Sequence, residues 1–135
     1  MTGPSRPTGS PGPAGDVSRR VDKPWGHELI WAHTEHYVGK ILVIETGRRL
    51  SLQRHLVKDE SIYVLSGRLL LTLEDDRGEL QTEELGSGDH RRVPTGRIHR
   101  YEAAERCEVL EVSTPELDDV VRIEDDFGRE GTSAP

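Results

Sequence analysis

The feature that most constrains the fold of this chain is the spacing of its apolar residues between positions 21 and 128. They come in short runs with a period near two, separated by turn residues, and no convincing amphipathic helix interrupts them. This alternation is typical of β-strands. The sequence therefore predicts strands at residues 38–45, 50–55, 61–65, 68–73, 80–85, 90–93, 98–103 and 108–113. Residues 117–123 fit either a last strand or a short helix.

Glycine-containing turns divide these runs and set the expected architecture. The pair Ser66-Gly67 is expected to end one strand, and residues 75–78 and 86–89 are expected to form further turns. Eight or nine short strands predict a single all-β domain over residues 21–128, either a sandwich or a closed barrel, and closure removes exposed sheet edges. Residues 1–20 are rich in proline, glycine and serine and predict a disordered tail, and residues 129–135 predict a flexible C-terminus.

Composition excludes several classes of function. The net charge of -7 argues against a nucleic-acid partner, because phosphate binding requires a concentrated basic surface. No stretch is apolar enough to cross a membrane, and the N-terminus lacks the pattern of a secretory signal. The one cysteine, Cys107, excludes an intramolecular disulfide and is expected to pack as a small apolar residue. We therefore expect a cytoplasmic protein.

Four side chains in two clusters have the chemistry of metal ligands. Gln53 and His55 lie two residues apart, so on a strand they point to the same face. Glu60 follows a short connection and can return to that face, while Pro94-x-Gly96-x-x-His99 forms a turn that can aim a second imidazole. Such ligands suit Zn²⁺, Fe²⁺, Mn²⁺ or Ni²⁺. Spacing alone leaves a second interpretation open, since a histidine on a strand is usually a surface or hydrogen-bonded residue.

The two clusters resemble the paired motifs of the cupin superfamily. The first reads G47-RRLSL-QRH-LVKD-E60-SIYVLS-G67 and the second G88-DHRRV-P94-T-G96-RI-H99. The segments K23-P-W-G26, S51-L-Q-x-H55-x-x-x-x-E60 and D118-D-V-V-R-I-E-D-D-F-G-R129 are similar to the C-terminal cupin of type II phosphomannose isomerases, which is commonly fused to a mannose-1-phosphate guanylyltransferase. The resemblance implies a jelly-roll β-barrel. It also implies a divalent metal, most readily zinc, held by Gln53, His55, Glu60 and His99.

This sequence departs from that family in the first motif. The family carries a run like H-H-H-R-x-E, whereas residues 55–60 read H-L-V-K-D-E, so two histidines are missing and Lys58 takes the place of the arginine. The tryptophan that follows the glutamate in the family is replaced near Ile62-Tyr63, and the sequence contains no nucleotidyltransferase domain. The resemblance therefore supports the family's fold and metal site for this chain better than it supports the family's substrate.

Other charged and aromatic residues carry more than one interpretation. Lys40 is either a solvent-facing lysine, the usual case, or a cavity lysine that binds a substrate oxygen or moves a proton. Glu111 is either a rim charge or a second carboxylate facing the cavity. Arg97 and Arg100 flank His99 and could recognise a sugar phosphate, although at least one is expected to be a surface charge. Trp25 is expected to close one end of the barrel.

Three functions are compatible with these residues. The first is a metal-dependent aldose–ketose isomerase of a sugar phosphate, with Lys40 or Glu111 moving the proton and Lys40, Arg97 or Arg100 binding the substrate. The second is a non-catalytic module that binds a metal and a small metabolite, which the missing histidines favour. The third is an iron-dependent oxygenase, against which Gln53 argues mildly. A small molecule is the expected partner in each case, and a homodimer is left open.

Overall fold

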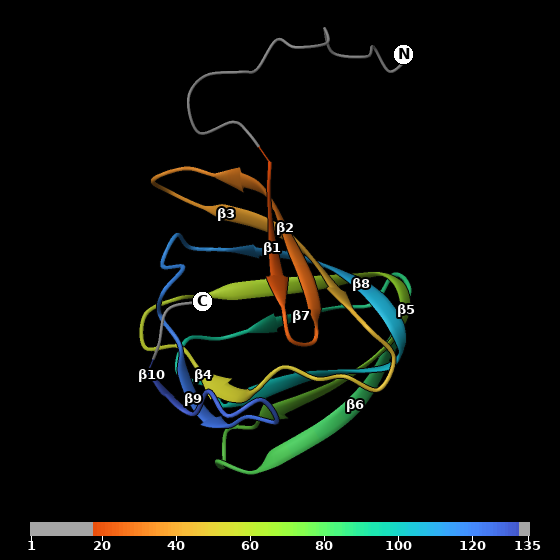
Figure 1. The fold of residues 1–135 in the computed structure, drawn as a ribbon. Helices are drawn as coiled ribbons and strands as arrows, with labels where there is room; N and C mark the ends of the chain where they lie inside the picture. The colour runs from red at the N-terminus through yellow and green to blue at the C-terminus, as the bar shows by residue number, and fades with distance from the viewer. Residues whose placement is uncertain (1–17, 133–135) are drawn as a thin grey trace, which may run out of the picture.

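Alternating apolar residues produce the strands that build this protein, and in space they form one strongly curled antiparallel sheet (Figure 1). The computed structural model describes residues 18–132, and none of these residues belongs to a helix that could cross a membrane. Ten strands lie in this part of the chain: β1 (Arg19–Lys23), β2 (Gly26–His33), β3 (Val38–Ile44), β4 (Leu52–Arg54), β5 (Glu60–Glu74), β6 (Leu80–Gly86), β7 (His90–Val93), β8 (His99–Ser113), β9 (Val121–Glu124) and β10 (Gly131–Thr132).

The strands β5 and β8 organise the sheet, because each has 15 residues and the two pair along almost their whole length. The second half of β8 also pairs with β3, which continues the sheet through β2 to β1. On the other side, β5 pairs with β7 through its first residues and with β6 through its last. The short strands β4, β9 and β10 complete the sheet next to the start of β8.

Two long strands replace four predicted short ones. The predicted turn at Ser66-Gly67 is an irregularity inside β5, where the register against β8 shifts between Val64 and Leu69. Likewise, the predicted strands at 98–103 and 108–113 are one strand, β8. Gly67 has φ +84, and a Cβ placed there would overlap the Arg106 carbonyl oxygen of β8. The glycine therefore permits a close approach of two backbones rather than a reversal of the chain.

The ends of the domain also differ from the prediction. The strand β1 begins at Arg19, so residues 19 and 20 belong to the sheet and not to the predicted tail, whereas residues 1–17 lie outside the described residues. The ambiguous segment 117–123 leads into β9, and residues 131–132 pair with it as β10. Part of the predicted flexible C-terminus is therefore structured, and residues 133–135 lie outside the described part of the chain.

The hydrophobic core lies inside the curled sheet. Its buried members come from most of the long strands: Trp25, Leu42, Ile44, Leu50, Ile62, Val64, Leu69, Leu71, Leu85, Val93, Tyr101, Ala103, Cys107 and Val109. Cys107 is fully buried, as expected of a small apolar residue, and burial raises the pKa of its thiol to about 11. Apart from Tyr101, this core does not include the polar side chains of the site described below, so the barrel has a source of stability largely separate from the site.

Substitution of Gly67 tests whether the close approach of β5 and β8 requires glycine. We expect Gly67→Ala to lower the free energy of unfolding by about 2 to 5 kcal/mol, because a positive-φ penalty of about 1 to 2 is added to an overpacking cost of about 1 to 3. Gly47→Ala is the matched control, since Gly47 has φ +79 but a Cβ added there would meet no atom within 4 Å. Urea unfolding of both variants measures the difference. Equal destabilisation would show that the backbone contact imposes no steric demand.

Candidate functional site

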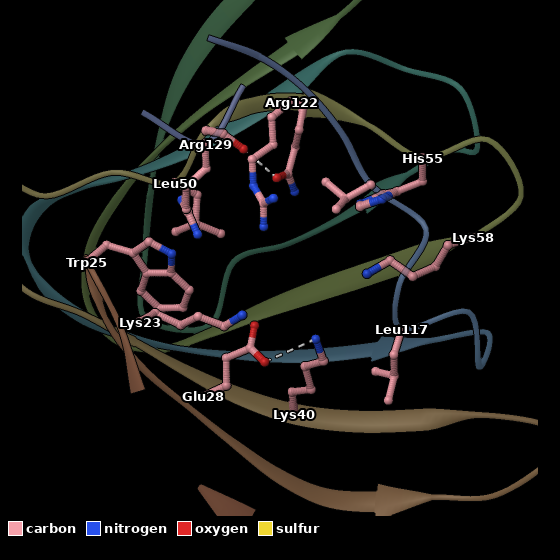
Figure 2. Close-up of a pocket in the computed structure, with 13 residues that line it drawn as sticks. Lys23, Trp25, Glu28, Lys40, Leu50, His55, Lys58, Leu117, Arg122 and Arg129 are labelled. Carbon is pink, nitrogen blue, oxygen red and sulfur yellow. Dashed lines mark hydrogen bonds and ion pairs between the residues drawn. The ribbon is translucent and has the colours of Figure 1, made fainter. Parts of the chain in front are cut away.

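A polar pocket opens inside the barrel and is lined by strands from both ends of the chain (Figure 2). Its walls combine five basic side chains with one acidic side chain and several apolar groups. The lining residues are Lys23, Trp25, Glu28, Lys40, Leu50, Ser51, Gln53, His55, Lys58, Leu117, Val120, Arg122 and Arg129. Trp25 is only 2% exposed and also belongs to the hydrophobic core, and its role in closing one end of the barrel stays a prediction.

Three predicted ligands meet beside this pocket. His55, Glu60 and His99 each offer a ligand atom, and these atoms lie within 4.8 Å of one another. All three residues are buried, with 4%, 3% and 1% of their surfaces exposed. His55 follows β4, Glu60 begins β5 and His99 begins β8, so three separate strand ends bring them together. The structure thus brings three of the four predicted ligands together, and their binding of a metal stays a prediction.

Backbone carbonyls fix the tautomer of both imidazoles. His55 Nδ1 lies 2.5 Å from the Asp119 carbonyl oxygen, and His99 Nδ1 lies 2.9 Å from the Arg97 carbonyl oxygen. A carbonyl can only accept, so each Nδ1 carries the proton and each Nε2 keeps a lone pair. Burial also lowers the pKa of His99, which favours the neutral ring. This arrangement, with Nδ1 anchored and Nε2 aimed at a common point, is typical of metal-binding histidines.

The remaining ligand atoms have no partner of their own. Among the described residues, His55 Nε2, Glu60 Oε1 and His99 Nε2 are buried without a hydrogen bond. His55 Nε2 lies 2.8 Å from Glu60 Oε1, so two acceptors face each other in a region shielded from water. Glu60 is held in place through its other oxygen, Oε2, which accepts a hydrogen bond of 2.7 Å from the Tyr101 hydroxyl. Two apposed lone pairs are unfavourable unless a cation lies between them, so this donor set fits a divalent metal.

Gln53 lies next to these three residues, but among the described residues its side chain forms no hydrogen bond with any of them. It pairs in register with His99 and lines the same pocket. Its Oε1 accepts a hydrogen bond of 2.7 Å from the Ser51 hydroxyl. An amide oxygen has a second lone pair, so this hydrogen bond leaves capacity for a metal. Gln53 as a fourth ligand stays a prediction.

Lys58 joins the cluster to a second buried carboxylate. Its Nζ lies 3.7 Å from Glu60 Oε1 and 3.7 Å from Glu111 Oε2. Burial opposes the charge of Lys58, but Glu111 and Glu60 outweigh it, so the pKa of the lysine is raised. Burial and the charge of Glu60 raise the pKa of Glu111. Burial acts against the charge of Glu60 too, but the charge of Lys58 holds the pKa of Glu60 well below its usual range. The carboxyl of Glu111 is therefore the weaker acid of the pair.

Lys40 faces the interior, so the solvent-facing interpretation is wrong. It shares the inner face of β3 with Leu42 and Ile44, and only 4% of its surface is exposed. Its Nζ forms an ion pair of 3.3 Å with Glu28 Oε1 on the neighbouring strand β2. Lys40 also pairs in register with Glu111. Both residues predicted to move protons thus lie inside the barrel, with Lys40 lining the pocket and Glu111 in contact with Lys58.

Arg97 and Arg100 are not brought to the pocket. The guanidinium of Arg97 binds the Glu74 carbonyl oxygen at 3.0 Å and the Asp76 carboxylate at 2.5 Å, which holds it against the β5–β6 turn. Arg100 donates from Nε to the Leu50 carbonyl oxygen at 3.0 Å. Arg100 follows His99 directly on β8, and adjacent residues of a strand point to opposite faces. Their predicted role in substrate binding therefore lacks support from their position.

Sequence reasoning missed several residues of the site. Asp119 anchors His55 through its carbonyl, and its carboxylate accepts three hydrogen bonds of 2.7 to 3.0 Å from the backbone N–H groups of residues 56–58. These hydrogen bonds outweigh burial and lower the pKa of Asp119. Tyr101 could have been found, because it lies two residues after His99 on the same face of one strand. Arg122 and Arg129 belong to the C-terminal segment that carries the resemblance, but spacing assigns them no role.

Comparisons with known proteins agree with this geometry. Residues 14–125 match the family model described as mannose-6-phosphate isomerase C-terminal. The chain is 33% identical over 118 residues to the mannose-1-phosphate guanylyltransferase ManC of Salmonella typhimurium. The aligned region covers 84% of this chain and 24% of that protein. It is 32% identical over 116 residues to the xanthan biosynthesis protein XanB of Xanthomonas campestris. Here the aligned region covers 82% of this chain and 24% of that protein. The chain thus spans about a quarter of the length of these relatives.

Solved structures show the same fold. KdgF from Halomonas superimposes with a TM-score of 0.63 at 23% identity, covering 72% of this chain and 87% of that chain. Oxalate decarboxylase from Bacillus subtilis superimposes with a TM-score of 0.71 at 18% identity, covering 81% of this chain and 31% of that chain. The expected all-β cupin barrel is confirmed by these likenesses and by the curled sheet.

Removal of one imidazole tests the metal cluster. We expect His99→Ala to lose most of its bound metal while keeping the β-sheet circular dichroism of the unaltered protein, because the hydrophobic core does not depend on the cluster. Elemental analysis of the purified protein measures the metal content. His90→Ala is the control, since His90 lies on the exposed strand β7 and stacks on Tyr63 away from the cluster. Full metal content in the His99 variant would exclude this residue as a ligand.

Asp119 provides a test of positioning without ligation. We expect Asp119→Ala to weaken metal binding about 10- to 100-fold, because the turn that presents His55 loses its three hydrogen bonds to the carboxylate. The neighbouring Asp118 is exposed, so Asp118→Ala is the matched control and should leave affinity unchanged. Competition with a metal-binding dye gives both affinities. Equal affinities in the two variants would contradict the anchoring role.

Proposed function

Because this chain belongs to the mannose-6-phosphate isomerase C-terminal family, we propose that it is a metal-dependent aldose–ketose isomerase acting on a sugar phosphate. The observation that carries the proposal is the set of three buried ligand atoms on His55, Glu60 and His99 that take part in no hydrogen bond. These atoms lie beside a pocket whose lining contains five basic side chains. The guanylyltransferase activity named for the longer relatives is not part of the proposal, since the chain spans about a quarter of their length.

The metal proposed for this site is zinc, held by His55, Glu60 and His99, with Gln53 as a fourth ligand. Neutral imidazoles with a carboxylate and an amide oxygen form a donor set that zinc accepts. When bound, a divalent metal would polarise the carbonyl group of the sugar and make the neighbouring C–H bond more acidic. Glu60 accepts a hydrogen bond from Tyr101 and forms an ion pair with Lys58. We assign it to metal binding and not to proton transfer, because a carboxylate that binds a metal is a poor base.

Isomerisation also requires a group that takes a proton from C2 of the aldose and returns it at C1. Lys40 and Glu111 are the two residues predicted to move the proton. Lys40 lines the pocket, whereas Glu111 is in contact with Lys58 and does not line it. The ion pair of Lys40 with Glu28 at 3.3 Å supplies a carboxylate and an ammonium in the same place. We assign the proton transfer to this pair. It ends each turnover in its starting state, because each proton taken from C2 is matched by one delivered to C1, even where the held proton exchanges with water.

A non-catalytic metal- and metabolite-binding module is the second candidate. The observation that favours it is the size of the pocket, which encloses about 50 Å³. Small-molecule sites usually measure about 300 to 1,000 Å³, so a hexose phosphate enters only if long side chains such as Lys23 and Lys58 swing aside. Binding of a metabolite without turnover would support this candidate. Iron with oxygen uptake would instead support an oxygenase.

Replacement of Lys40 by arginine tests the proton-transfer assignment. Arg keeps the positive charge beside Glu28 but does not release a proton near neutral pH, so we expect Lys40→Arg to lower kcat about 10²- to 10⁴-fold. The measurement is the interconversion of mannose 6-phosphate and its ketose, together with deuterium uptake at C2 in heavy water. Metal content should be unchanged in the variant. Turnover within a few-fold of the unaltered protein would move the assignment to Glu111, and absence of turnover in the unaltered metal-loaded protein would leave the binding module.

A further inference from the structure

We infer that Lys23, Arg122 and Arg129 form an anion-binding subsite that takes the phosphate group of the substrate inside the pocket that His55 also lines. The inference rests on the proposed function for the identity of the substrate, while the binding of the anion itself requires no turnover. No motif of metal ligands includes these residues. The geometry therefore assigns a second, chemically different part of the same pocket.

The three cations come from separate segments and converge on one space. Lys23 ends β1, Arg122 lies on β9, and Arg129 lies in the turn between β9 and β10. All three line the pocket. Figure 2 shows Lys23 and Arg129 projecting from the side of Trp25, whereas His55 and Lys58 project from the opposite side. A ligand with an oxygen at one end and an anion at the other can therefore reach both groups.

Cations gather on this side of the pocket. Among residues 18–132, Lys40 is paired with Glu28 and Arg129 with Asp125, whereas the ammonium group of Lys23 has no ion pair. A phosphate monoester carries about -1.5 to -2 at neutral pH and could supply the missing negative charge. The carboxylates of Glu60 and Glu111 lie beside Lys58 instead. This local gathering of cations contrasts with the net charge of the whole chain, which is -7.

Lys23 is the residue for which the folded protein provides least compensation. Its ammonium group forms no hydrogen bond or ion pair with another residue between 18 and 132, and the carboxylate that attracts it, Glu28, is paired with Lys40 at 3.3 Å. Burial lowers the pKa of Lys23, and the charges of Lys40, Arg122 and Arg129 lower it further. Such mutual repulsion of cations opposes folding, and a bound anion would relieve it.

Arg129 is oriented for a ligand by its own ion pair. Its Nε and Nη2 donate to the two oxygens of Asp125 at 2.8 and 3.1 Å, and Asp125 also accepts from the Arg129 backbone N–H at 2.7 Å. This contact fixes the plane of the guanidinium and does not use Nη1. Guanidinium groups match the geometry of phosphate oxygens, so a fixed Arg129 beside Arg122 can contribute directed hydrogen bonds rather than charge alone.

Most other arginines of the sheet differ in that each faces an acidic partner on the exterior. Arg91 pairs with Glu83 at 2.8 Å and Arg92 with Asp59 at 3.1 Å, and these side chains are well exposed. Surface pairs of this kind are screened by water and attract anions weakly. They provide matched controls that remove an arginine without touching the pocket.

Calorimetric titration of inorganic phosphate into metal-free protein tests the subsite. We expect Lys23→Gln to weaken phosphate binding at least 10-fold and Arg91→Gln to leave it unchanged. Arg129→Lys, which keeps the charge near Asp125 but loses the planar fork, should weaken binding at least 3-fold. Thermal midpoints of the three variants check that they are folded. Lys23 ends an edge strand and is only partly buried, so its variant is expected to fold even if the Arg129 variant does not.

The outcomes separate this inference from the isomerase proposal. Phosphate binding that requires the metal, or that is equal in the Lys23 and Arg91 variants, would overturn the subsite and leave the isomerase untouched. Metal-independent phosphate binding that Lys23→Gln weakens supports the subsite even if no sugar phosphate is turned over. In metal-loaded protein, a Lys23→Gln variant with a raised KM for mannose 6-phosphate and unchanged affinity for mannose would place the phosphate, and not the sugar, at this position.

Discussion

The curvature of the β5–β8 ladder is the constraint on which the rest of the structure depends. Glu60 pairs in register with Ser113, whereas His99 pairs with Leu73 at the other end of the same ladder. In a flat sheet, about 14 residues of strand would separate these ends by about 47 Å. Yet the ligand atoms of Glu60 and His99 lie within 4.8 Å of each other. The site can form only because the register shifts around Gly67 bend the two long strands back on themselves.

This curvature also explains which parts of the fold could be predicted from the sequence. Alternation identifies the inner faces of the strands correctly, because the period of two survives any bending of the sheet. Ser66-Gly67 resembles a turn, since a glycine with positive φ serves a turn and a bulge equally well. Only the partner strand distinguishes them, and that information is not local. The segment 98–113 is divided in the prediction for a related reason, because Glu105 and Arg106 follow Ala104 and resemble a loop, whereas all three lie exposed within β8.

The site shows where reasoning from single residues reaches its limit. His55, Glu60 and His99 can be found because they stand in two motifs that resemble those of the cupins. The charge of Lys40, by contrast, favours solvent even though its position shares the face of Leu42. Its partner Glu28 lies on another strand, so the ion pair that permits burial could not be seen in the sequence. Arg97 and Arg100 are favoured by proximity to His99 along the chain, although Arg100 as the next residue of a strand has to point away from it. Asp119 acts partly through its carbonyl, which no side-chain pattern reveals.

The division of the pocket between central and peripheral strands has an evolutionary consequence. Glu60 and His99 lie at the starts of the two longest strands, whereas Lys23 and Arg122 lie on short strands near the ends of the described chain. Mutations in β1 or β9 can therefore alter the cationic side of the pocket while the cluster of His55, Glu60 and His99 is retained. A lineage could diversify its substrates by exchanging these peripheral segments, and the ladder formed by β5 and β8 would pass unchanged from one specificity to the next.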